Sequence, residues 1–123
     1  MKQWIGRWLI GVAVIHTVFG VVVFGKELLG IVQRGVFDTV GTDPMTGAVV
    51  WFLLFGAVLF ICGQAVSRLE ASSPAALSKG LGWSLLALGL LGVVLMPASG
   101  FWLVFPPAIA LLVKRGGAKP ALA

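Results

Sequence analysis

Four apolar segments separated by short polar stretches dominate the pattern of this chain. A helix that crosses a bilayer needs roughly 20 mostly apolar residues, at about 1.5 Å of rise per residue. Each segment approaches this length, so the pattern predicts an all-α membrane protein with four transmembrane helices in an antiparallel bundle. The expected spans are residues 5–24, 48–66, 77–96 and 98–113, all within one membrane domain covering residues 1–123.

Local signals mark the ends of these segments. Asp43–Pro44 is typical of a helix N-cap followed by proline in the first turn, and Ser73–Pro74 predicts a similar start for the third span. The fourth span is the shortest and contains Pro106–Pro107, so we expect it to be kinked or extended through residues 98–100. The basic start of the first segment also fits a secretory signal, but its apolar run continues to Phe24 and favours a retained span.

The connection between the first two spans, residues 25–47, is too apolar for a plain linker. Glu27 lies seven residues before Arg34, and Asp38 lies four after it, which would put all three on one face of a helix. We therefore expect an amphipathic helix here, at the membrane interface or dipping between the spans. Its simplest role is that of a capped connector on the surface.

The charged residues orient the expected bundle. The chain is 59% hydrophobic and 11% charged, with a net charge of +5, and its basic residues sit at the ends of apolar runs. That distribution favours contact with lipid headgroups over nucleic acid, and its asymmetry predicts an inner-membrane protein with both termini inside. Seven basic residues would lie on the inner side, which comprises the N-terminal end, the loop 67–76, the start of the third span and the tail 114–123: Lys2, Arg7, Arg68, Lys79, Lys114, Arg115 and Lys119. Two would lie on the outer side: Lys26 and Arg34.

Small residues predict how the spans pack, because in lipid they allow helices to approach closely. Gly56 and Gly63 are seven apart on the second span, and Gly82 and Gly89 are seven apart on the third. Matching their depths at about 1.5 Å per residue pairs Gly56 with Gly89 and Gly63 with Gly82.

Polar side chains near this seam suggest a contact across it. Gln64 and Ser84, with Cys62 nearby, would fall at similar depths. They would form either one wall of a polar vestibule that opens inward or a simple interhelical hydrogen bond, and the absence of an accompanying charge favours the bond.

His16 is the strongest candidate for a functional residue. An ionisable side chain near the bilayer midplane is costly and usually has a partner inside the bundle. Proline at 106 and 107 leaves the carbonyls of Trp102 and Leu103 without their helical donors. We expect neutral His16 to donate a hydrogen bond to this stretch. The role of His16 stays open between a structural lock, a proton relay, an acid/base and a headgroup contact.

The candidate ligand-binding set follows from these positions. It comprises His16, Trp102 and Pro106, with Glu27 and Arg34 if the outer connection folds into the bundle. One cysteine and one histidine provide no intrachain disulfide and no spacing for zinc, haem or an iron–sulfur cluster, so we expect no metal or cofactor.

Three motifs carry a resemblance to a known type of protein. They are Trp4–Ile5–Gly6–Arg7, His16–Thr17–x–x–Gly20 and Met96–Pro97–x–Ser99–Gly100–Phe101–Trp102–Leu103. With them, the chain resembles an uncharacterised family of short bacterial four-span membrane proteins, and in layout it is loosely similar to the DoxX-like group. The resemblance implies a bacterial cytoplasmic membrane and no particular activity.

Three functions remain open from the sequence. The first is a protein that binds a hydrophobic or amphipathic small molecule or supports a larger membrane complex. The second is a membrane-embedded isomerase or redox-linked enzyme that uses His16 as its acid/base. The sequence disfavours this function, because acid–base catalysis usually requires a second group and every Asp and Glu lies outside the expected spans. The third is an oligomeric transporter or channel, since one four-helix bundle leaves little room for a pore.

Overall fold

The computed structural model describes residues 3–113, and within them the chain is helical with no strand. The all-α prediction is therefore confirmed. The predicted tail at 114–123 and the basic residue Lys2 lie outside the described residues. The elements in chain order are α1 (Ile5–Val23), α2 (Gly25–Gln33), α3 (Pro44–Ser72), the 3-10 helix η1 (Pro74–Ala76), α4 (Lys79–Leu95), the 3-10 helix η2 (Gly100–Val104) and α5 (Phe105–Val113).

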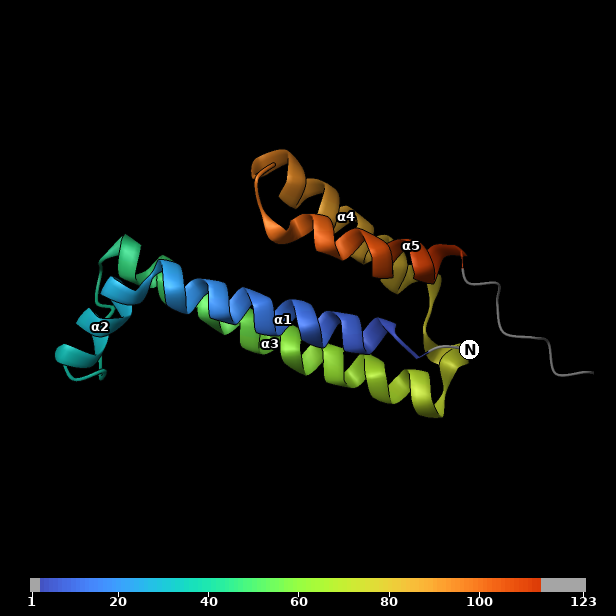
Figure 1. The fold of residues 1–123 in the computed structure, drawn as a ribbon, viewed down its shortest axis with the longest axis horizontal. Helices are drawn as coiled ribbons and strands as arrows, with labels where there is room; N and C mark the ends of the chain where they lie inside the picture. Colours follow the sequence, from blue (N-terminus) through green and yellow to red (C-terminus); the bar gives the residue numbers. More distant parts are fainter. Residues whose placement is uncertain (1–2, 114–123) are drawn as a thin grey trace, which may run out of the picture.

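The helices form two antiparallel pairs instead of one evenly packed bundle (Figure 1). α1 lies along α3, and α4 lies along α5. The pairs meet near the start of α1, where α1 contacts η2 and α5, and they diverge toward their other ends. Among the described elements α3 does not pack on α4, so the predicted arrangement of a four-helix bundle is wrong in this respect.

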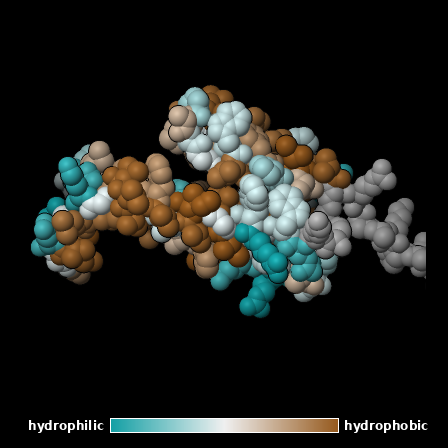
Figure 2. Space-filling model, in the orientation of Figure 1, coloured by the Kyte–Doolittle hydropathy of each residue, from teal (hydrophilic) through white to brown (hydrophobic). Residues whose placement is uncertain are grey.

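Two helices, α1 and α3, are long and apolar enough to cross a membrane. α4, with 17 residues, and the combined stretch Gly100–Val113 are shorter apolar helices. Hydrophobic side chains cover the middle of the α1–α3 pair on the face in Figure 2, and hydrophilic ones gather toward its two ends.

The helix starts follow local capping chemistry. Asp43 caps α3 as predicted, accepting hydrogen bonds from the backbone N–H and the hydroxyl of Thr46. These bonds, mainly that of the hydroxyl, hold the pKa of Asp43 below its usual value. The start predicted at Ser73–Pro74 is wrong: these residues lead into η1, and Ser78 caps α4 instead. α4 therefore begins at Lys79, and α3 extends beyond the predicted end at residue 66.

The fourth apolar segment is broken, as its two prolines predict. It begins as η2, capped by the hydroxyl of Ser99, and continues as α5 from Phe105. Pro106–Pro107 lies in the first turn of α5, where a missing N–H removes no helical hydrogen bond inside α5.

The connection between the first two long helices contains the expected helix, but a shorter one. α2 ends at Gln33, before Arg34. Gly35, Val36 and Asp38 then adopt positive φ angles, so Arg34 and Asp38 do not share a helical face. Arg34 instead donates from Nε to the hydroxyl of Thr39 at 3.0 Å.

The glycines of α3 face α1, not α4. A Cβ on Gly63 would come within 2.8 Å of the Ile10 side chain, and one on Gly56 within 3.0 Å of the His16 ring. From the opposite helix, a Cβ on Gly6 would overlap the backbone of Ser67. Small residues thus bring the two backbones together, as expected of helices that pack in lipid.

The glycines of α4 face the C-terminal helix in the same way. A Cβ on Gly82 would come within 3.0 Å of Leu111, and one on Gly89 within 3.2 Å of the Phe105 ring. The predicted pairs Gly56–Gly89 and Gly63–Gly82 are therefore wrong. Each glycine packs within its own antiparallel pair, although only residues 73–78 separate α3 from α4.

We predict that Gly6→Ala destabilises the fold, because its methyl group cannot be accommodated without moving the α3 backbone. Overpacking of this kind typically costs about 1–3 kcal/mol. Gly11→Ala is the matched control, since a Cβ at Gly11 meets nothing within 4 Å. Thermal unfolding of the detergent-solubilised variants should show a lower midpoint for Gly6→Ala alone. Equal midpoints would contradict the close contact.

Candidate functional site

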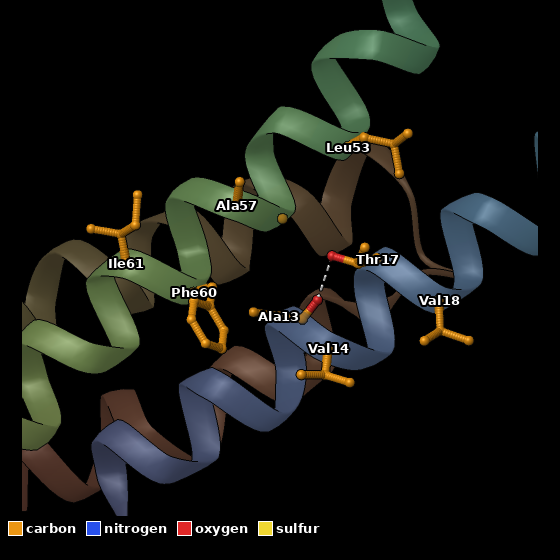
Figure 3. Close-up of a pocket in the computed structure, with 9 residues that line it drawn as sticks. Ala13, Val14, Thr17, Val18, Leu53, Ala57, Phe60 and Ile61 are labelled. Carbon is orange, nitrogen blue, oxygen red and sulfur yellow. Dashed lines mark hydrogen bonds between the residues drawn. The ribbon is translucent and has the colours of Figure 1, made fainter. Parts of the chain in front are cut away.

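A groove runs along the seam between α1 and α3 (Figure 3). Its apolar part has a volume of about 430 Å³. Val14 and Val18 border it on α1, and Leu53, Phe60 and Ile61 border it on α3. The volume lies in the range of about 300–1,000 Å³ that is usual for small-molecule sites.

Small side chains create the space in this groove. Ala13 on α1 and Gly56 and Ala57 on α3 are among the residues that line it. Thr17 also lines it, but its hydroxyl donates to the Ala13 carbonyl at 2.9 Å (Figure 3). The hydroxyl is thereby satisfied within α1, so this part of the groove remains apolar in character.

A polar hollow continues the groove toward the end of α3. It has a volume of about 450 Å³ and shares Ile61 with the apolar part. Gln64, Ser67 and Arg68 supply its polar side chains. The predicted contact between Gln64 and Ser84 is not formed, because Ser84 donates to the carbonyl of Gly80 in its own helix at 2.9 Å.

Glu70 is the ionisable residue that sequence reasoning overlooked. It lies near the end of α3, is only 5% exposed, and accepts the backbone N–H groups of Ile5, at 3.2 Å, and Gly6. The N-cap residue of α1, Trp4, makes no capping bond through its side chain. A carboxylate 64 residues away therefore caps α1 and lies at the positive end of its dipole.

One signal in the sequence pointed to this role. No Ser, Thr, Asp or Asn precedes the first apolar run, so the start of α1 needs a cap from elsewhere. The expected antiparallel path then brings the end of the second helix, which carries Glu70, to that start.

His16 lies against α3, not against the fourth apolar segment. Its ring stacks on Phe52 with centroids 3.9 Å apart, and Phe55 meets it edge-on at 5.5 Å. The Nε2 atom lies 2.8 Å from the Phe52 carbonyl oxygen, and since a carbonyl only accepts, Nε2 donates. The predicted partner of His16 is therefore wrong.

The carbonyl freed by the prolines does accept a hydrogen bond from α1, but from a different residue. Nε1 of Trp8 donates to the Leu103 carbonyl at 2.7 Å. The Trp102 carbonyl accepts from the backbone N–H of Phe105. The Leu103 carbonyl is thus the free acceptor that the prolines predict, but its donor on α1 lies eight residues before His16.

The remaining candidate ligand residues are not gathered in one place. The Trp102 indole donates to the Pro97 carbonyl at 2.8 Å, and Pro106 is exposed. Glu27 lies on α2, and Arg34 bonds Thr39 beyond the end of that helix. None of the five borders the groove between α1 and α3.

Comparison with known proteins agrees with the resemblance seen in the motifs. The model of a family of unknown function, DUF6463, matches residues 1–117. The chain belongs to this family. Membership of an uncharacterised family is thus confirmed, and both the four-span layout and the looser DoxX-like likeness stay predictions.

A curated relative of this DUF6463 member matches over a shorter stretch. The thiol:disulfide interchange protein DsbD of Colwellia psychrerythraea (strain 34H) is 37% identical over 79 residues, which is 64% of this chain. The match covers 12% of the length of that protein. No solved structure matches the chain significantly.

We predict that Glu70→Gln destabilises α1, because an amide has one accepting oxygen for two backbone donors and carries no charge. Leaving a buried donor unpaired costs about 1–3 kcal/mol. Glu27→Gln is the control, since Glu27 is the acidic residue of α2 and lies outside this contact. Hydrogen exchange should speed up at the start of α1 in Glu70→Gln. Unchanged exchange there would contradict the capping role.

Proposed function

We propose that this chain is a four-span inner-membrane protein, with both termini inside, that binds a hydrophobic or amphipathic small molecule in the groove between α1 and α3. Exposure supports the membrane setting. Only 28% of the apolar stretch in α1 and 17% of that in α3 are buried inside the fold. Helices with so little burial leave their apolar side chains in contact with the solvent, and lipid is the solvent that favours them.

Helix lengths support the four-span arrangement. The 29 residues of α3 extend about 43 Å, which matches the 40–45 Å of a bilayer with its headgroups. The 17 residues of α4 extend about 25 Å, and η2 with α5 is shorter. Spans somewhat shorter than the hydrocarbon core are accommodated by local thinning of the bilayer.

The groove is the observation that carries the proposed binding function. It is concave, lies between two helices and joins an apolar part to a polar one. Sites for small molecules usually combine an apolar lining with a few polar groups that orient the ligand.

The enzyme alternative receives less support. Nε2 of His16 is engaged with the Phe52 carbonyl, and the ring is held by stacking on Phe52, which favours the structural role of this residue. Thiol exchange, which the name of the DsbD relative describes, would need a partner thiol for Cys62. The chain has one cysteine, so no intrachain dithiol can form.

We predict that the two ends of α3 are accessible from opposite sides of the membrane. In a Cys62→Ser background, Phe37→Cys should react with a membrane-impermeant maleimide in intact spheroplasts, because Phe37 is 91% exposed in the outer connection. Ala75→Cys, on the inner side, should react only after lysis. Labelling of Ala75→Cys before lysis would overturn the orientation, and equal labelling of both would argue against a membrane-spanning pair.

We predict that Ala57→Phe, which fills the apolar part of the groove, weakens ligand binding at least tenfold. The probe is parinaric acid, whose fluorescence rises in an apolar site, titrated into the detergent-solubilised chain. Ala87→Phe makes the same change at an exposed position of α4 away from the groove and should bind as the wild type does. Equal affinities in the two variants would remove the groove as the site.

A further inference from the structure

The groove changes character along its length in one direction. Its apolar part extends from Leu53 to Ile61 on α3, and its polar part continues from Ile61 to Arg68. Arg68 lies on the side where the sequence places most basic residues, four residues before the end of α3. A ligand that fills the whole groove must therefore combine an apolar chain with a polar head next to a cation.

The depth of Arg68 matches the headgroup boundary of one leaflet. The middle of α3 is at residue 58, so Arg68 lies ten residues, or about 15 Å, from it on the inner side, and Leu53 lies about 7 Å from it on the outer side. Half of a bilayer comprises about 15 Å of hydrocarbon and about 5–7 Å of headgroup. A lipid of the cytoplasmic leaflet that lies along the groove would bring its headgroup level with Arg68.

The charge of Arg68 is not neutralised by the protein in the described part of the chain. Its guanidinium makes no ion pair there, and its backbone carbonyl, not its side chain, accepts from Ser72. The nearest carboxylate in the sequence, Glu70, is buried and bonded to the start of α1. An unpaired guanidinium beside an amide and a hydroxyl is suited to a phosphate group, which accepts several hydrogen bonds at once.

We propose that the groove holds an anionic phospholipid of the cytoplasmic leaflet. One acyl chain lies along the apolar part between α1 and α3, and the headgroup phosphate contacts Arg68, with Gln64 and Ser67 beside it. Anionic lipids are abundant in that leaflet, which favours this occupant over a neutral one. The proposal rests on the membrane orientation and on the groove as the binding site.

The test compares phosphatidylglycerol with phosphatidylcholine. The full chain is placed in nanodiscs containing equal amounts of the two lipids, released into the gas phase, and the lipids that remain bound are counted by native mass spectrometry. The wild type should retain phosphatidylglycerol at least fivefold over phosphatidylcholine. Arg68→Gln should lose this preference, and Arg68→Lys should keep most of it.

Two further variants separate this proposal from the proposed function. Lys79→Gln removes an inner-side cation outside the groove and should keep the preference, whereas Ala57→Phe should lower retention of both lipids. Retention of both lipids without preference would overturn the anionic headgroup while leaving the groove as a binding site. If Ala57→Phe does not change lipid retention, both the lipid proposal and the groove as a binding site are overturned. Both are also overturned if the chain forms a dimer that Ala57→Phe abolishes, because a second copy would then fill the groove.

Discussion

The structure depends on the close approach of α1 to α3. In the membrane setting proposed above, burial of apolar area does not drive helices together, and close contact between backbones supplies the attraction. Gly6, Gly56 and Gly63 make that contact possible, since each faces the other helix with no side chain between. Glu70 then adds an ionic cap to the start of α1, so the pair is fixed both along its seam and at one end.

The second pair is attached to the first at the point where its own helix is broken. The prolines of α5 leave the Leu103 carbonyl without a helical donor, and Trp8 of α1 satisfies it. An unpaired carbonyl in an apolar setting is costly, so the break creates a specific docking point. The far ends of the two pairs, which lack such a contact, lie apart (Figure 1).

The same small residues account for the groove and separate it from His16. Ala13, Gly56 and Ala57 leave the groove open on one side of the seam. His16 packs against Phe52 and is not among the residues that line it. The most unusual residue of the apolar segments therefore supports the helix pair, and the proposed ligand site is lined by less conspicuous residues, with Arg68 at its polar end.

Periodicity and local chemistry determined the helices of this protein. The length of α1, the Asp43 cap of α3, a helix in the outer connection and the break before α5 all depend on interactions within a few residues. Local interactions did not determine which helices pack against each other. Matching the depths of glycines cannot decide which helix faces which, because every apolar segment carries small residues and several pairings bring them to equal depth. Only the tertiary structure paired α3 with α1, moved the partner of the Leu103 carbonyl from His16 to Trp8, and joined Glu70 to a helix start 64 residues away.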